Sequence, residues 1–520
     1  MNQNNQLTVG ERNMNNEQIK MNERIAEFNK MFNSIKFDNN IYIIGKGAIG
    51  TILLHVITKF IIMDKKKIHV IDGKDRGQIM KELKETINEY VVEIELINEY
   101  VKQDNYKRIF SKLKKDDIII DCSIDVCTMD IIKLCQDVGS SYINSSIETW
   151  DYKEEKDPYK YSLYYKYKEA KKYSSLINVK KFNAILGFGC NPGMVSIWAK
   201  KGLDLINKHY GNNNKIIHYG KTAKDLGLHV IHISEKDTQR TNNPKTYNEY
   251  CNTWSTTMEP FYQESLAPIE MTWGTHEENP EKIEKVSKYI ENDRYVVFDK
   301  LCIETFAKSY TPISKNYIGR LIRHEENLTI GDTFSIYEND KRIYCPSVYY
   351  VYHPTNDTMM SLNELKERNY IYQDKYRLLT KEIIDGADEL GLTFFMENGD
   401  IFWVGSLLNI DESRKLFDNK LNNYINATII QVIGGYLSGL FHIINNINNN
   451  IYEGVLSPDD IPHEKIFDTM KSFYGKFVCI QVTDWNYSQA NKIKYFSEFG
   501  ISEDQNIKNK KKWTFDQFLV

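Results

Sequence analysis

The distribution of apolar and polar residues changes sharply near residue 40. Residues 1–37 are polar and rich in asparagine, which predicts an extension with weak helical structure at most. From residue 40 onward, short apolar runs typical of buried strands alternate with segments of helical apolar spacing. We expect strands at 41–44, 68–71, 91–97, 117–121, 141–144 and 182–187, and helices at 48–62, 105–113, 128–136 and 192–206. This alternation predicts an α/β domain with a parallel, doubly wound sheet.

A second pattern begins beyond about residue 210. Short alternating runs such as 229–234 and 348–353 predict a second, α+β domain with a mixed or antiparallel sheet. Near the end, 427–445 predicts a long apolar helix that contains Gly434, Gly435 and Gly439. Because glycine destabilises a helix, we expect close packing against another element to compensate.

These patterns predict five parts along the chain. They are a polar N-terminal extension (1–37), the α/β domain (38–210), the α+β domain (211–425), a segment that returns to the first domain (426–490), and a polar tail (491–520).

Composition adds little beyond a soluble, globular character. The formal net charge of −4 over 520 residues offers no electrostatic reason to expect nucleic acid as a partner. The apolar stretch 41–63 is interrupted by Lys46, His55 and Lys59, so it predicts a strand, turn and helix rather than a membrane span. The eight cysteines form no C-x-x-C pair, and no secretory signal opens the chain. We therefore expect a cytoplasmic protein without a metal site and without a membrane partner.

The first predicted strand leads directly into Gly45-Lys46-Gly47-Ala48-Ile49-Gly50, a G-x-G-x-x-G turn before a helix. In a Rossmann-type fold, these glycines permit the tight turn, the approach of backbone to pyrophosphate and close packing of helix on strand. The helix N-terminus then presents N–H groups to the phosphates.

Asp72 ends the second predicted strand, 22 residues after Gly50. A carboxylate at this place accepts hydrogen bonds from the adenosine ribose hydroxyls and repels the additional phosphate of NADP. We therefore predict NAD as the cofactor, with Lys74 and Arg76 as the residues that would oppose this preference. Ser123, two residues beyond the fourth predicted strand, is a further candidate contact. Ubiquitin-type activating enzymes share a similar opening, but the missing C-x-x-C pairs argue against that class.

Dense motifs follow in the rest of the chain. They are Ile147–Trp150, Gly189–Ser196, Ile231–Arg240, Asn252–Trp254, Trp273–Glu277, His324–Glu326, Tyr352–Asp357, Asp385–Gly391, Trp403–Ser406 and Thr483–Trp485. In this order, and together with the glycine-rich turn, they resemble the bacterial-type, NAD-dependent homospermidine synthases, which are related in fold to saccharopine dehydrogenases. The resemblance extends from about residue 38 to about residue 490.

The resemblance implies an aminobutyl transferase of polyamine biosynthesis. Putrescine is oxidised by NAD and deaminated, the product condenses with a second putrescine, and the new imine is reduced to sym-homospermidine without net NADH. The resemblance also implies a homodimer, with residues 38–210 as the NAD-binding Rossmann domain and residues 211–425 as the substrate, catalytic and dimerisation domain. Spermidine is a possible second substrate.

The matching motifs supply candidate residues for a doubly charged amine. Glu148, Glu264 and Asp388 are candidates for binding the ammonium groups, since an unpaired buried charge is costly. The candidate catalytic residues are His324 as proton acceptor, Trp254 as a face for a cationic intermediate, and Asn191, Glu235 and Glu326 beside them. We expect Asp237 and Arg240 to pair with each other at a strand end.

Two departures from the family pattern bear on the substrate. Glu325 stands where relatives carry Asn, and Glu148-Thr-Trp150 stands where they often carry Glu-Pro-Trp. Two other functions remain open: a saccharopine-dehydrogenase-like enzyme acting on an amino acid or amine, and a non-catalytic NAD-binding regulator. An amino-acid substrate would need Arg or Lys anchors, whereas the predicted pocket is mainly acidic.

Overall fold

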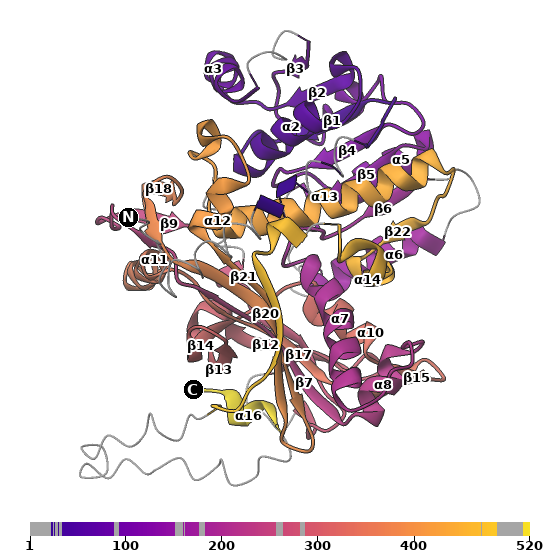
Figure 1. Cartoon of the computed structure of the whole chain (residues 1–520), viewed down its shortest axis with the longest axis vertical. Coiled ribbons are helices and arrows are strands. Elements are labelled where there is room, and N and C mark those ends of the chain that lie inside the picture. The colour runs from indigo at the N-terminus through magenta and orange to yellow at the C-terminus, as the bar shows by residue number, and fades with distance from the viewer. Residues whose placement is uncertain are drawn as a thin grey trace, which may run out of the picture.

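The computed structural model describes residues 34–87, 93–150, 160, 162–175, 182–255, 264–280, 286–469, 471–485 and 513–520, together with 22, 23, 25, 26 and 30. Most of the predicted N-terminal extension and most of the predicted tail lie outside these residues. Two large sheets organise the molecule, and Figure 1 shows one above the other.

The first sheet has the strand order β22-β6-β5-β4-β1-β2-β3, and all of its pairs are parallel. This confirms the predicted doubly wound sheet. Its strands are β1 (Ile41–Ile44), β2 (Ile68–Ile71), β3 (Glu95–Ile97), β4 (Ile118–Asp121), β5 (Ser141–Asn144), β6 (Asn183–Ile185) and β22 (Gly454–Leu456). The helices of this part are α2 (Ala48–Phe60), α3 (Arg76–Ile87), α4 (Tyr106–Ile109), α5 (Thr128–Val138) and α6 (Leu163–Ser175). Five of these strands are buried along their whole length, which explains their largely apolar sequence.

The second sheet is mixed, as the short alternating runs predict. Its order is β11-β12-β10-β17-β7-β20-β21-β23, with β14 beside β17 and β13 beside β14. Only β17 and β7 are parallel among these described pairs. The strands are β7 (Leu228–Asp237), β10 (Pro268–Thr272), β11 (Val286–Ile290), β12 (Tyr295–Leu301), β13 (Phe306–Thr311), β14 (Lys315–Ile322), β17 (Ser347–His353), β20 (Ala387–Met396), β21 (Ile401–Asn409) and β23 (Lys476–Gln481).

Helices α7 (Met194–His209), α8 (Tyr219–Asp225) and α10 (Glu326–Thr333) pack against the second sheet. Smaller elements are α11 (Asn356–Glu367), α12 (Ile410–Lys415), α14 (His463–Ile466), α16 (Phe515–Phe518) and three strand pairs: β8 (Arg240–Thr241) with β19 (Ile383–Asp385), β9 (Glu249–Asn252) with β18 (Lys375–Leu378), and β15 (Ile336–Glu338) with β16 (Lys341–Tyr344). The helix predicted from Pro192 begins two residues later, at Met194.

Helix α13 (Ala427–Asn448) is the long apolar helix that the sequence predicts. It lies along the first sheet in Figure 1 and contacts α2 and β5 as well as β20 and β21 of the second sheet. By length and composition it could span a membrane, but 89% of its apolar window is buried inside the protein. Its glycines permit close packing, since a Cβ on Gly435 would lie 1.8 Å from the carbonyl oxygen of Gly189.

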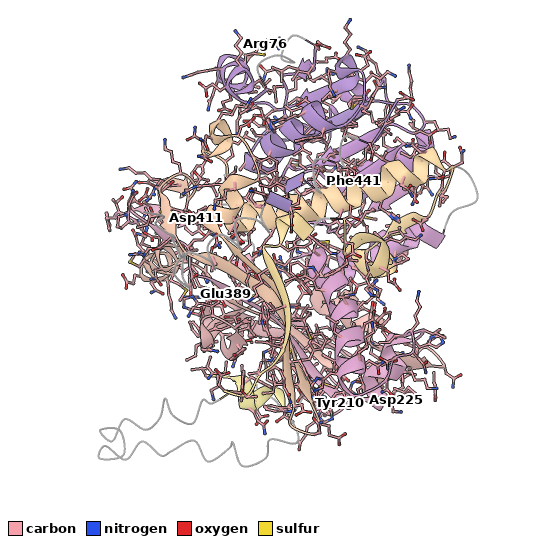
Figure 2. The ribbon with its side chains drawn as sticks, in the orientation of Figure 1. Arg76, Tyr210, Asp225, Glu389, Asp411 and Phe441 are labelled. Atoms are coloured by element: carbon pink, nitrogen blue, oxygen red, sulfur yellow. The ribbon has the colours of Figure 1, made fainter. Side chains whose placement is uncertain are left out.

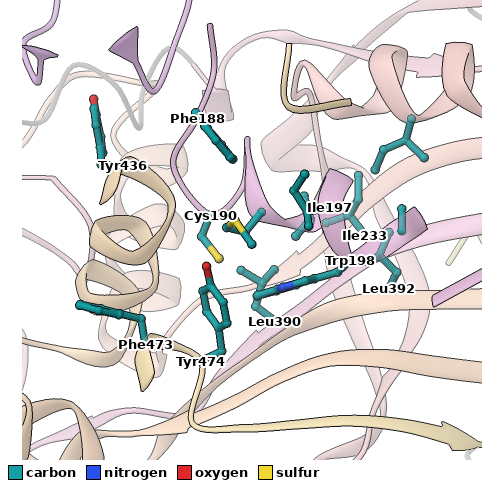
Figure 3. Close-up of a cluster of buried hydrophobic side chains, with 14 of the residues drawn as sticks. Phe188, Cys190, Ile197, Trp198, Ile233, Leu390, Leu392, Tyr436, Phe473 and Tyr474 are labelled. Atoms are coloured by element: carbon teal, nitrogen blue, oxygen red, sulfur yellow. The ribbon is translucent and has the colours of Figure 1, made fainter. Parts of the chain in front are cut away.

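One continuous hydrophobic core joins the two sheets. Figure 3 shows Phe473 and Tyr474 beside α13, with Trp198 of α7 and Leu390 of β20 next to them. The rings of Trp198 and Tyr474 meet edge to face, with centroids 5.1 Å apart. The position of α13 between the sheets therefore depends on burial from both sides.

In Figure 2, the charged side chains of Arg76 and Asp225 lie at the periphery, and both residues are exposed.

Candidate active site

A cavity of about 350 Å³ extends from the glycine-rich turn to the second sheet. At one end, it is lined by turns that follow β1, β2 and β4, where the carboxyl ends of parallel strands meet. The predicted cofactor residues that line this end are Gly45, Gly47, Ala48, Ile49, Asp72 and Ser123.

The geometry of the turn fits a bound dinucleotide. Gly45 has a φ of +84°, and a Cβ there would lie 2.9 Å from the carbonyl oxygen of Cys122. Gly50 does not line the cavity, and a Cβ on it would lie 2.0 Å from the carbonyl oxygen of Gly45. Larger residues would therefore disrupt the turn at Gly45 and separate α2 from it at Gly50, so the N-terminus of α2 is held at the cavity.

Asp72 is 7% exposed and is oriented by backbone donors on both sides. Its Oδ2 accepts from the N–H of Lys46 at 2.7 Å, and its Oδ1 accepts from the N–H of Lys74 at 2.9 Å. A carboxylate fixed in this way retains acceptor capacity for ribose hydroxyls.

Ser123 is oriented by the last residue of β4. Its N–H and its hydroxyl donate to Oδ1 of Asp121 at 3.0 and 2.5 Å. Burial raises the pKa of Asp121 to about 6. The serine is therefore held at the cavity wall by a buried carboxyl group.

The other end of the cavity gathers polar residues from elements far apart in the sequence. Asn191 follows β6, Glu235 lies in β7, and His324 lies between β14 and α10. The other predicted site residues that line this end are Glu148, Trp254 and Glu264.

Glu235 is the centre of a buried hydrogen-bond network. Its Oε2 accepts from the amide of Asn191 at 2.5 Å and from the hydroxyl of Tyr350. The same Asn191 amide also donates to the Tyr350 hydroxyl at 2.8 Å. Burial raises the pKa of Glu235 to about 7 although both of these donors oppose the shift. Glu235 can therefore change its charge near neutral pH.

His324 lies between two carboxylates. Its Nδ1 is 3.2 Å from Oε1 of Glu326, and its Nε2 is 3.5 Å from Oε1 of Glu264. Burial alone would lower the pKa of His324, but Glu326 and Glu264 raise it well above its ordinary value. These two carboxylates therefore favour the imidazolium form of His324 in the free protein, which alters its role as a simple proton acceptor.

Glu326 and Asp388 do not line the cavity. Glu326 is 1% exposed and reaches the cavity through its contact with His324. Asp388 is fully buried in β20, directly opposite Asp237 of β7. Burial raises the pKa of Asp388 well above its ordinary value, and the charges of Glu235 and Asp237 add to this effect.

Trp254 and Glu148 lie at the cavity wall on opposite halves of the molecule. Trp254 packs against a small apolar cluster that contains Tyr250 and Leu362. Oε1 of Glu148 accepts from the hydroxyl of Ser146 at 2.9 Å. Trp254 thus combines a packing contact with a surface that faces the cavity.

Sequence reasoning gave no role to several residues that line the cavity, among them Tyr350, Tyr352, Lys166 and Arg323. The two tyrosines stand two positions apart in β17, and their alternation is a signal that they share a face. Arg323 lies 3.3 Å from Glu270, and burial lowers the pKa of Lys166, which is close to Glu148 and Glu325. The cavity is therefore acidic but not exclusively so.

The expected pair of Asp237 and Arg240 is wrong. Asp237 is buried and accepts from the side chains of Gln239 and Thr253. Arg240 is exposed and pairs with Asp385 of β19. The two side chains diverge because β7 ends at Asp237 and the chain turns before Arg240.

Two family models match the chain in sequence. The model described as the saccharopine dehydrogenase NADP binding domain matches residues 41–177. The model described as the saccharopine dehydrogenase C-terminal domain matches residues 189–474, more than half of the chain. The chain belongs to the saccharopine dehydrogenase family.

The chain is also similar to proteins named homospermidine synthases. The protein of that name from Mesorhizobium japonicum is 29% identical over 459 residues, 86% of this chain and 90% of the relative. The one from Blastochloris viridis is 29% identical over 467 residues, 86% of this chain and 92% of the relative. A crystal structure of the homospermidine synthase from Legionella pneumophila in complex with NAD superposes with a TM-score of 0.81, at 28% identity, over 94% of this chain and 99% of the other. The resemblance that the motifs predict is confirmed.

Proposed function

We propose that the protein is a homospermidine synthase that converts two molecules of putrescine into sym-homospermidine and ammonia. The observation that carries the proposal is a single cavity with a dinucleotide-binding turn at one end and Glu235, Glu264 and His324 at the other. A bound NAD would accept a hydride from the carbon that bears the reacting amine and return it to the condensed imine, so no NADH accumulates.

The acidic end suits a diamine with a positive charge at each end. A buried ammonium needs a carboxylate partner, and Glu235 and Glu264 offer two of them. Asn191 and Tyr350 hold the Glu235 carboxylate in place through hydrogen bonds. Asp388 lies behind Glu235, so its proposed role is to tune the charge of this carboxylate rather than to touch the substrate.

His324 can lose its proton when the substrate binds. An ammonium group that binds Glu264 would compete with the imidazolium for this carboxylate. The imidazole released in this way can accept the proton that the reacting amine must lose before it is oxidised. Glu326, 3.2 Å from the other ring nitrogen, fixes the orientation of the ring.

Trp254 is proposed to cover a cationic intermediate with its indole face. A cation over an indole gains about 0.5–2 kcal/mol, depending on how far water is excluded. Glu148, on the first half of the molecule, is proposed to bind an outer ammonium group. We further propose a cytoplasmic homodimer, on the strength of the family resemblance.

An amino-acid oxidoreductase is the second candidate, because Lys166 and Arg323 line the same cavity. Both cations lie beside carboxylates of the protein, Arg323 beside Glu270 and Lys166 near Glu148 and Glu325. They are thus charge-compensated within the protein, which favours the diamine.

The test is product analysis with purified protein, putrescine and NAD at a small fraction of the putrescine concentration. We expect homospermidine and ammonia in equal amounts by mass spectrometry and ammonia assay, with flat NADH absorbance. Trp254→Ala should bind NAD with unchanged affinity but form the product far more slowly. Net NADH without a polyamine product would overturn the proposal, and NADH formed from an amino acid would favour the second candidate. A parallel reaction with spermidine shows whether a triamine is accepted.

A further inference from the structure

Lys46, between the first two glycines of the glycine-rich turn, carries a buried ammonium group. The side chain of Lys46 is 1% exposed, and its Nζ lies 2.6 Å from Oε2 of Glu82 on α3. The other oxygen of Glu82 accepts from the side-chain amide of Gln78, one helical turn earlier, at 3.0 Å. Glu82 is 24% exposed, so this ion pair lies at the edge of the fold but holds an ammonium group inside it.

The same lysine is adjacent to the carboxylate that is expected to bind the ribose. Its backbone N–H donates to Oδ2 of Asp72. Burial lowers the pKa of Lys46, Glu82 opposes this most strongly, and the charges of Lys74 and Asp72 also act on it. Lys46 does not line the cavity, whereas Asp72 and Lys74 do.

A lysine ammonium group that pointed toward the ribose site beside Asp72 would favour NADP over NAD. A phosphate on the adenosine 2′-oxygen would lie beside Asp72, which repels it. Lysine has a flexible four-carbon chain and is a common phosphate ligand, so an ammonium group near Asp72 would offset that repulsion. The direction in which Lys46 points therefore matters for the choice between NAD and NADP.

We infer that Glu82 is a positioning residue that sets cofactor specificity by holding the Lys46 ammonium group behind the turn. Asp72 then faces the ribose without a competing cation from the turn. The inference rests on the proposed function in one respect, since it requires that the turn binds a nicotinamide dinucleotide.

The experiment compares dissociation constants for NAD and NADP, measured by isothermal titration calorimetry without substrate. In Glu82→Ala, the dissociation constant for NADP should fall about tenfold, the scale of one added charge-assisted hydrogen bond, while that for NAD changes by less than about twofold. Glu85→Ala, on the exposed side of the same helix, is the matched control and should leave both constants unchanged.

The double variant Lys46→Met with Glu82→Ala isolates the lysine. It should lose the gain in NADP affinity, because the cation that Glu82 releases is gone. Glu82→Gln keeps the size of the side chain and should shift the NAD-to-NADP ratio in the same direction if Glu82→Ala fails to fold, as judged by circular dichroism.

An unchanged ratio in both Glu82 variants, or a gain that persists without Lys46, would overturn the inference. A wild-type protein that binds neither nucleotide would instead contradict the proposed function. The two failures are therefore distinguishable in one data set.

Discussion

At the scale of single residues, three buried carboxyl groups lie close together, those of Glu235, Asp237 and Asp388. Asp237 and Asp388 are direct cross-strand neighbours of β7 and β20, and Glu235 lies two residues before Asp237. Burial raises the pKa of Asp237 to about 6 and that of Glu235 to about 7. Ionising them all would place several like charges in a water-poor region. A positively charged substrate relieves this repulsion.

Glu235 should therefore make putrescine binding depend on pH. Below about pH 7 its carboxyl group is mostly protonated and offers no charge to an ammonium group. The KM for putrescine should fall as the pH rises from 6 to 8, and the fall should be much smaller in Glu235→Gln. A steady-state series in overlapping buffers measures this. The hypothesis fails if the variant keeps the slope of the wild type.

The raised pKa of Glu235 also predicts that the stability of the free protein falls as the pH rises, whereas putrescine binding improves. The pKa of Glu235 is higher in the folded protein than in the unfolded chain. Its contribution to stability is therefore fully present at a pH below the pKa of the unfolded chain, and it is lost as the pH rises through about 7. In the free protein, Glu235→Gln should gain melting temperature relative to the wild type between pH 5 and pH 8. Glu338→Gln, at an exposed position of β15, is the control.

At the scale of elements, α13 positions a loop that lines the cavity. Gly435 packs directly on the carbonyl oxygen of Gly189, two residues before Asn191. Tyr436, the next residue of the helix, donates to the carbonyl oxygen of Asp121 at 2.6 Å. The helix thus contacts backbone behind both ends of the cavity. Glycine is required at position 435, because a Cβ there would overlap the backbone of the loop at Gly189.

Gly435→Val should displace this loop. Overpacking a tight interface costs about 1–3 kcal/mol, so the free energy of unfolding should fall by about this amount. We also expect kcat to fall, because Asn191 would no longer hold Glu235 in place. Asn445→Ala, at an exposed position of α13, should change neither quantity. Denaturant unfolding and steady-state kinetics measure the two effects, and a fully active variant would contradict the proposed coupling.

At the scale of the whole molecule, one buried glutamate links the two sheets. Oε1 of Glu270, in β10, accepts from the N–H of Leu163 at 3.1 Å, at the start of α6. Arg323 lies 3.3 Å from the same oxygen. Helix α6 itself packs against strand β22 of the first sheet and against helix α5. Glu270 therefore caps a helix of one half from a strand of the other, beside the shared cavity.

Glu270→Gln should weaken this link. It leaves the Arg323 guanidinium, which is 13% exposed, without its carboxylate, and loss of one partner of a buried pair costs about 3–5 kcal/mol. We expect a lower melting temperature and a higher KM for putrescine, since the cavity lies between the two halves. Glu169→Gln, in an exposed ion pair of the same helix, is the control. An unchanged melting temperature would show that Glu270 does not join the halves.

The sequence by itself determined the local structure and the cofactor end of the site. Apolar periodicity predicts β1, β2, β5 and α13 closely, because the apolar residues that each element buries lie within one short, continuous segment. The turn at Gly45–Gly50 and the position of Asp72 belong to one strand–helix–strand unit, so their spacing is sufficient to predict their proximity. The boundaries of β3 and α4 are less well predicted, since both elements are short and their ends depend on packing.

Only the tertiary structure decided the other end. Glu235 and Tyr350 meet because β7 and β17 pair in parallel across more than a hundred residues, and no local pattern specifies that register. Burial and neighbours in space also explain why Tyr350 contacts Glu235, why Asp388 lies outside the cavity and why the pKa of His324 is raised. The same reason explains why Arg240 pairs with Asp385 rather than with Asp237: contacts between distant segments are chosen by the core that the whole chain can bury.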